Sequence, residues 1–370
     1  MTSSDSNLPR SDVRSAHSGS DARSAHPGSD ARSGPPDPRG AEARAALPVR
    51  DRGKAGPRRV GFLLIPGFAL MAYGCAMEPY RAANDLTGRE LYRWRHASPD
   101  GQPVLASNGV AILPDQGIER AMEVDDLFVC AGGNPARFDN PATLAWLRTQ
   151  AARGVRIGGI SGGPFLLARA GLLAGHRCTA HWEYIPAMAE HFPDLDLTRT
   201  IYEIDRDRCT SSGGTAALDM MLALVAAEYG RPLAHAVSEW FLHTRMREGG
   251  ESQRMSLRER YGVGHPTLLA VLERMERALE EPLERADLAA AGGVSLRQLE
   301  RLFRAHLGRT IGEHYLALRL DRARALLRQT SLPVLEVALA SGFASAAHFS
   351  RAYCSRFGLP PRSERTRPVA

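Results

Sequence analysis

The 370-residue sequence has few of the features that mark secreted, membrane-bound or zinc-binding chains. Its five cysteines are scattered and form no CxxC pair, which favours free thiols in a reducing compartment over a disulfide framework or a zinc site. No apolar run reaches the roughly eighteen residues of a membrane span, and no apolar segment follows the N-terminal charges. We therefore expect a cytoplasmic protein that does not contact a membrane and carries no metal and no cofactor.

Lysine is almost absent, since Lys54 is the only one, and arginine carries nearly all of the positive charge. Residues 285–370 hold fourteen arginines against six aspartates and glutamates. Such a local excess is the electrostatic footprint of a polyanionic partner. Charge alone does not separate nucleic-acid binding from a composition that favours arginine throughout.

The length of the chain predicts more than one domain. Residues 1–57 form a low-complexity leader, in which a nine-residue unit occurs at Ser11–Gly19 and Ser20–Gly28 and in truncated form at Ser29–Gly34. Proline, glycine, serine and charged residues dominate this leader, and little in it can be buried. We expect it to be disordered.

Residues 58–248 alternate short apolar runs, glycine-bearing loops and helical stretches. The runs at 60–65, 126–131 and 155–160 are each followed by a glycine-bearing loop, as is typical of buried parallel strands. Helical periodicity occurs at 141–153, 215–228 and 233–247. This alternation predicts a doubly wound α/β domain.

A polar, glycine-bearing segment at 249–265 has the composition of a linker. Only short amphipathic helices are expected after it, at 266–364. An all-α domain of a different class is therefore predicted to follow the α/β domain.

The helical domain contains an internal repeat. Residues 287–303 predict a helix, a tight turn at Gly293 and a second helix that Ser295 can cap. The pattern returns at 337–353, where Gly342 matches Gly293. We predict two helix-turn-helix units, joined by an amphipathic helix at about 311–329 that fixes their separation.

The stretch GFASAAHFSRAYCSRFG, at 342–358, closely resembles the signature of the AraC/XylS family of transcriptional regulators. The resemblance covers residues 266–364. It implies binding to promoter DNA, usually to activate transcription beside RNA polymerase, and hence a nucleoid-associated protein. A helical dimerisation domain is the alternative interpretation of the same helices.

The exposed faces of the second helices, together with the family pattern, predict which residues contact DNA. Arginine can read guanine through two hydrogen bonds and glutamine can pair with adenine, whereas alanine offers only methyl contacts. Arg301 and Arg351 could instead contact phosphates or serve packing. The predicted DNA-binding residues are Arg297, Gln298, Arg301 and Arg304 in the first unit, and Ala346, Ala347, His348 and Arg351 in the second.

In the α/β domain, residues 159–163 (GISGG) fit the G-x-S-x-G nucleophile elbow of serine hydrolases. His181 follows, and the Gly132–Gly133 loop could donate backbone hydrogen bonds to an oxyanion. However, no acidic residue lies between Ser161 and His181, so the order of a hydrolase triad is not met.

The segments GFLLIPGF, VCAGGNP, GGISGGPFLLARAGLLAG, CTAHWE and TSSGGTAALDMML resemble the ThiJ/PfpI-type amidotransferase-like domain, which implies a flavodoxin-like fold. In catalytic members a cysteine occupies the elbow and an acidic residue after the first strand assists it. Here Ser161 and the acid-free loop 66–71 stand in their place. We predict no catalytic residue and no enzymatic activity. The alternative is a bifunctional regulator with residual hydrolase or amidase activity at Ser161.

The domain order resembles the GlxA-type regulators of the AraC family, and LYRWRHASPDGQPVLASNGV is most similar to regulators of glycine-betaine, carnitine or arginine catabolism. This resemblance implies a catabolic operon and a small-molecule effector that is a quaternary amine or an amino acid. Aromatic faces can hold a quaternary ammonium while loop amides hold a carboxylate, although core packing is the alternative for each aromatic. We also expect a homodimer. The predicted ligand-binding residues are Phe68, Tyr73, Gly132, Gly133, Ser161, Gly162, His181 and Trp182.

Overall fold

The computed structural model describes residues 56–330 and 332–364. The predicted leader lies outside these residues, apart from its last two positions. Within the described ranges, no helix is both long and apolar enough to cross a membrane.

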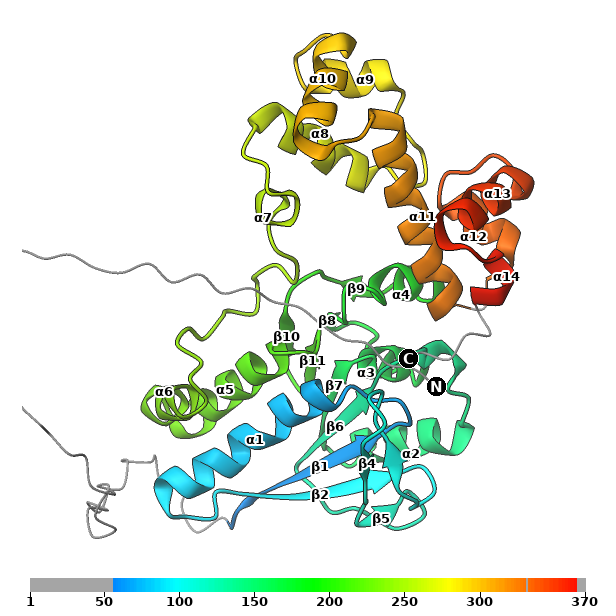
Figure 1. Cartoon of the computed structure of the whole chain (residues 1–370). Coiled ribbons are helices and arrows are strands. Elements are labelled where there is room, and N and C mark those ends of the chain that lie inside the picture. The colour runs from blue at the N-terminus through cyan, green and yellow to red at the C-terminus, as the bar shows by residue number, and fades with distance from the viewer. Residues whose placement is uncertain (1–55, 331, 365–370) are drawn as a thin grey trace, which may run out of the picture. The chain divides into compact units, whose positions relative to one another are not determined.

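A seven-stranded sheet forms the centre of the α/β domain (Figure 1). The strand order is β10-β11-β7-β6-β1-β2-β5, and the pairs are parallel except for β10 with β11. The carboxyl ends of β1, β6 and β7 therefore meet at one edge, where ligands of doubly wound sheets usually bind. The strands are β1 (Arg58–Leu64), β2 (Tyr92–Ser98), β5 (Gln116–Gly117), β6 (Asp126–Ala131), β7 (Arg156–Ser161), β10 (Tyr202–Asp205) and β11 (Arg208–Ser211).

Helices pack on both faces of this sheet, as the alternation of the sequence predicts. One face carries α1 (Leu70–Thr87), α5 (Ala216–Tyr229) and α6 (Arg231–Trp240), and the other carries α2 (Pro141–Ala152), α3 (Gly163–Arg169) and α4 (Ile185–His191). Neighbouring residues such as Phe62 and Leu63 belong to different apolar clusters because successive side chains of a strand point to opposite faces. The doubly wound prediction is confirmed. The remaining short elements of this domain are β3 (Val104–Leu105), β4 (Ala111–Ile112), η1 (Pro135–Arg137), β8 (Arg177–Cys178) and β9 (Asp196–Leu197).

The helix predicted at 233–247 is shorter than expected, because α6 ends at Trp240. Leu242 adopts a left-handed φ of 56°, and the chain turns back toward α5. There the Nε2 atom of His243 lies 2.8 Å from the carboxylate of Asp219, and Arg247 pairs with the same carboxylate at 2.6 Å. Asp219 is fully buried, and a buried carboxylate needs such partners. Helical periodicity carries no information about this long-range pairing.

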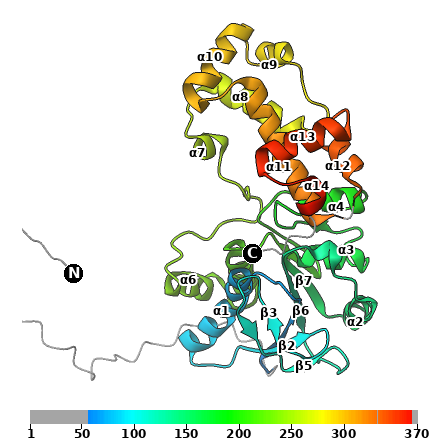
Figure 2. The ribbon, with the colours of Figure 1, turned by 45° about the vertical axis from the view of Figure 1, so that its right-hand side comes forward.

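The C-terminal domain consists of helices alone in its described residues, as predicted, and Figure 2 shows α11 (Ile311–Gln329) running between two groups of them. Each group surrounds its own apolar cluster. The helical turn α7 (Leu257–Tyr261) falls inside the predicted linker and has its own capping box. The first group is α8 (Pro266–Arg277), α9 (Arg285–Ala291) and α10 (Leu296–Leu307), and the second is α12 (Val334–Ala340), α13 (Ala346–Phe357) and α14 (Pro361–Glu364).

The two groups repeat the same local geometry, which confirms the predicted pair of helix-turn-helix units. The turns place Gly293 and Gly342 at φ angles of 65° and 76°, a region that favours glycine. Ser295 and Ser345 cap α10 and α13 through their side-chain oxygens. Both helices end at a left-handed glycine, Gly308 and Gly358 respectively.

Candidate DNA-binding and ligand-binding sites

Helix α10 is positioned by its buried face and exposes arginines on the opposite face. Leu299 and Phe303 are fully buried against α8, α9 and α11. Arg297, Arg301 and Arg304 are exposed, and within the described residues no carboxylate pairs with them. Unpaired guanidinium groups on one exposed helix face are suited to the phosphates and base edges of DNA.

Gln298 lies on the same exposed turn, but its side chain also serves the helix cap. Its Oε1 atom accepts hydrogen bonds from the backbone nitrogen of Ser295 at 2.9 Å and from the Ser295 hydroxyl at 3.0 Å. The Ser295 hydroxyl in turn accepts from the Gln298 backbone nitrogen at 3.3 Å. This reciprocal cap occupies the carbonyl end of the amide and leaves the NH2 group for a partner.

The exposed face of helix α13 is less polar than that of α10. Phe349 and Tyr353 are fully buried, Ala347, His348 and Arg351 are exposed, and Ala346 is half-buried. The His348 ring also packs edge-on against Phe343, with 5.5 Å between the ring centroids. Arg351 is thus the one exposed guanidinium among the four positions predicted for this unit.

Sequence reasoning missed the residues of α11 that hold the second unit in place. Arg319 donates hydrogen bonds to the carbonyl oxygens of Ser341 at 2.9 Å and Gly342 at 2.5 Å. Its guanidinium also lies over the Phe343 ring, 4.3 Å from the centroid. The sequence signal for this role is that Arg319 is an arginine placed among the apolar positions of residues 311–329.

In the α/β domain, Ser161 occupies the predicted elbow between β7 and α3. Its φ of 61° lies in the left-handed region, which a serine adopts only when its surroundings impose it. Gly163 allows the close approach, because a β-carbon there would lie 2.0 Å from the carbonyl oxygen of Val129. The sequence motif therefore forms the sharp strand-to-helix turn that it predicts.

Several predicted ligand-binding residues meet around this elbow. The backbone nitrogen of His181 donates to the carbonyl oxygen of Ser161 at 3.3 Å, and Gly162 donates to Ala131 at 3.0 Å. Tyr184, an aromatic residue beside these loops, donates from its hydroxyl to the carbonyl oxygen of Gly133 at 3.2 Å. Gly132, Gly133, Ser161, Gly162 and His181 thus come from three loops to one edge of the sheet.

In the described part of the chain, no hydrogen bond joins the Ser161 hydroxyl to the His181 ring. Burial lowers the pKa of His181, so its ring is neutral at neutral pH, and the Glu183 carboxylate lies 3.9 Å from its Nδ1 atom. The Tyr184 hydroxyl lies beside the Ser161 side chain, and burial raises the pKa of Tyr184, so this hydroxyl is no base. The loop at 66–71 supplies no acid. The elbow thus presents hydrogen-bonding groups, while the hydrogen bond from a base that activates a serine is not formed here.

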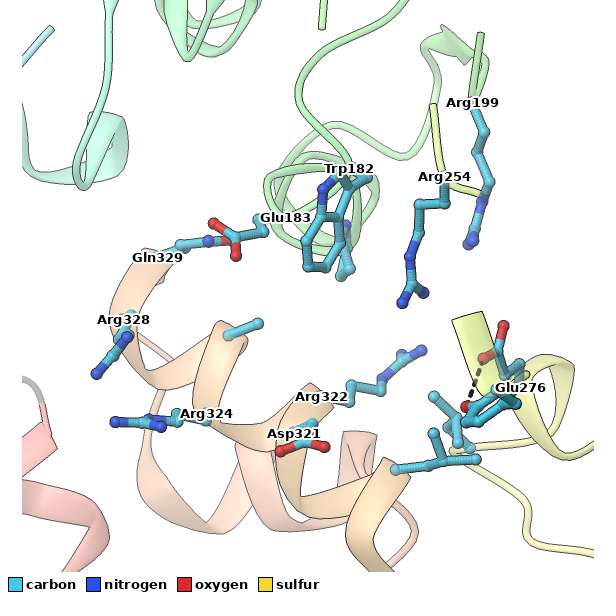
Figure 3. A pocket seen from close by; sticks show the side chains of 15 residues that line it. Trp182, Glu183, Arg199, Arg254, Glu276, Asp321, Arg322, Arg324, Arg328 and Gln329 are labelled. Carbon is cyan, nitrogen blue, oxygen red and sulfur yellow. Dashed lines mark hydrogen bonds between the residues drawn. The ribbon is translucent and has the colours of Figure 1, made fainter. Parts of the chain in front are cut away.

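The predicted aromatic residues divide between the core and the surface. Phe68 and Tyr73 are buried in the cluster beneath α1, and the Tyr73 hydroxyl lies 2.7 Å from Nε2 of His96. Trp182 is 40% exposed, and the guanidinium of Arg254 lies over its ring at 4.8 Å from the centroid (Figure 3). Phe68 and Tyr73 therefore support the loops of the elbow from below.

The chain is similar to known proteins over both domains. Residues 58–227 match the DJ-1/PfpI family, and residues 288–367 match a helix-turn-helix domain. The HTH-type transcriptional regulator GbdR of Pseudomonas aeruginosa is 46% identical over 309 residues, which cover 84% of this chain and 84% of that protein. The HTH-type transcriptional regulator CdhR of the same organism is 49% identical over 304 residues, which cover 82% and 90%. A crystal structure of an AraC family transcriptional regulator from Pseudomonas putida is 31% identical, covers 50% of this chain and 100% of that one, and gives a TM-score of 0.46.

Proposed function

We propose a division of roles within this chain, which belongs to the HTH-type transcriptional regulators that combine a DJ-1/PfpI domain with an AraC-type helix-turn-helix domain. The tandem units bind promoter DNA of a catabolic operon and activate its transcription beside RNA polymerase. The α/β domain binds a small nitrogenous effector without chemical turnover. The active species is a homodimer.

The main support for the DNA-binding role is that two helices of the same local geometry, α10 and α13, lie at the two ends of a single helix, α11. The 19 residues of α11 span about 28 Å, close to the roughly 34 Å of one turn of DNA. Two recognition helices at that spacing reach successive major grooves on one face of the duplex. Arg297 and Arg301 supply most of the base contacts from α10, and Arg351 supplies them from α13.

The effector site is the elbow at the carboxyl ends of β6 and β7. The Ser161 hydroxyl and the loop amides of Gly132 and Gly133 hold the carboxylate of a quaternary amine or amino acid, and Gly162 shapes the turn beside them. His181 borders the same loops as a neutral hydrogen-bonding group. The lack of a hydrogen bond between the Ser161 hydroxyl and the His181 ring, among the described residues, supports binding rather than hydrolysis.

Two measurements test these roles separately. Footprinting of the upstream region should show two protected segments about 10 base pairs apart, centre to centre. Calorimetry with glycine betaine, carnitine and arginine should show saturable binding of one of them to the full chain. Failure of all three to bind would remove the effector class and leave the DNA-binding role intact.

A further inference from the structure

Five arginines line one cavity, which is distinct from the elbow. Arg324 and Arg328 pair with Glu364, which leaves three arginines from separate segments. Arg199 follows β9, Arg254 precedes α7, and Arg322 belongs to α11; Figure 3 shows their side chains around the same space. The cavity measures about 520 Å³, the size of a small-molecule site. Its lining includes Trp182 but not Ser161 or the Gly132–Gly133 loop.

Arg254 is held in position, although it lies within the predicted linker. The side-chain amide of the preceding Gln253 donates to the Thr179 hydroxyl at 3.0 Å and to the carbonyl oxygens of Ala180 at 2.9 Å and Thr200 at 2.8 Å. The Arg254 guanidinium then stacks on Trp182. These contacts preorganise the guanidinium and reduce the entropy lost on binding a ligand.

The positive charge of the cavity is only partly neutralised by neighbouring carboxylates. In the described part of the chain neither Arg199 nor Arg254 forms an ion pair. Arg322 pairs with Glu280 at 3.7 Å and lies near Glu190, but its Nε atom is buried without a hydrogen-bond partner. Burial, and then the charges of Arg260 and Arg199, lower the pKa of Arg254. The guanidinium groups nevertheless stay protonated at neutral pH, so their mutual repulsion persists.

Two of the three acidic residues in the lining form ion pairs with other arginines. Glu276 pairs with Arg260 at 2.8 Å, and Asp321 pairs with Arg356 at 2.8 Å. Glu183 alone faces the cavity without an arginine partner among the described residues. Arg199 and Arg254 are exposed and Arg322 is half-buried, so an anionic ligand could reach all three and supply the missing counter-charge.

We propose that Arg199, Arg254 and Arg322 bind a small oxyanion, a phosphate or a carboxylate, at a second ligand site of the protein. Planar guanidinium groups match the geometry of such oxyanions through paired hydrogen bonds. The same three charges repel the quaternary amines proposed for the elbow, so the two sites select different ligands. Because Arg322 belongs to α11, a bound anion contacts the helix that spaces the two recognition helices.

Calorimetry on the full chain tests this site, with inorganic phosphate and succinate as probes at constant ionic strength set with sodium chloride. Saturable binding of either probe is expected. Arg199→Gln and Arg254→Gln should each weaken it about tenfold, the effect of losing one charge-assisted hydrogen bond. Arg322→Gln should weaken it comparably, while Arg148→Gln, a change at an exposed residue of α2, should leave it unaltered.

The two probes distinguish a phosphate ligand from a carboxylate ligand. Absence of saturable binding by the folded wild-type chain, or equal affinity in all four variants, would overturn the proposal. So would a loss of DNA affinity in Arg199→Gln and Arg254→Gln without binding of either probe, because the arginines would then serve the DNA backbone. None of these outcomes depends on whether the elbow binds a quaternary amine.

Discussion

Gly213 packs directly against Ser161, so that a β-carbon added to the glycine would lie 2.6 Å from the β-carbon of the serine. Both residues have left-handed backbones, with φ of 83° and 61°. The turn after β11 and the elbow after β7 therefore fit together only because one of them lacks a side chain. This contact makes the shape of the elbow sensitive to a residue fifty positions away in the sequence.

Replacing Gly213 by alanine should destabilise the α/β domain by roughly 2–3 kcal/mol, because the change adds both backbone strain and a steric clash. Gly214→Ala is the matched control. Its φ is 54° and no atom lies within 4 Å of the added carbon, so only the strain of about 1 kcal/mol applies. Denaturant unfolding measures both variants, and equal losses would mean that the contact with Ser161 is unimportant.

The buried carboxylate of Glu364 should make the second helix-turn-helix unit sensitive to acid. Burial opposes ionisation, but hydrogen bonds from Tyr353, Arg324 and Arg328 outweigh it and hold the pKa of Glu364 below its ordinary value. A lowered pKa in the folded state stabilises the fold above the ordinary value of about 4.3. This stability should be lost as the pH falls through the folded pKa.

Glu364→Gln should remove that acid dependence and cost about 1–3 kcal/mol at neutral pH, since the two arginines are partly exposed. Hydrogen exchange of α13 amides at pH 7 and below pH 4 reports the effect locally. The exposed Glu336→Gln, in α12, serves as control. An identical pH profile in wild type and Glu364→Gln would contradict the assignment.

Local patterns predicted the features that depend on neighbouring residues. Gly293 and Gly342 mark turns whose φ angles favour glycine, and Ser295 caps the helix that follows it, as the repeat in the sequence indicated. The elbow at Ser161 was predictable for the same reason, because its glycines permit one tight turn. The turns and the cap are encoded within about ten residues, whereas the elbow also depends on the distant Gly213.

The features that were missed depend on partners far apart in the sequence. The end of α6 is set by Asp219, which requires His243 and Arg247 as partners from a later loop. Phe68 stays a predicted pocket residue, and its sequence neighbourhood did not reveal that its side chain is fully buried. A one-dimensional pattern shows which residues are apolar or charged but not which of them meet.

Ser161 should fail to react as a nucleophile. A fluorophosphonate probe should leave the wild-type chain unlabelled at neutral pH, because among the described residues the Ser161 hydroxyl is not hydrogen-bonded to the His181 ring. DNA affinity should be the same in wild type and Ser161→Ala. Labelling that disappears in Ser161→Ala would instead establish the bifunctional alternative.

The central claim is that exposed arginines of α10 read promoter DNA. A gel-shift titration of the upstream promoter fragment at one fixed salt concentration tests it most directly. The account predicts that Arg297→Ala loses roughly 1–3 kcal/mol of specific binding and keeps its affinity for unrelated DNA, whereas Arg120→Ala, at an exposed residue of the α/β domain, binds like wild type. Promoter affinity that is unchanged in Arg297→Ala, Arg301→Ala and Arg351→Ala alike would contradict it.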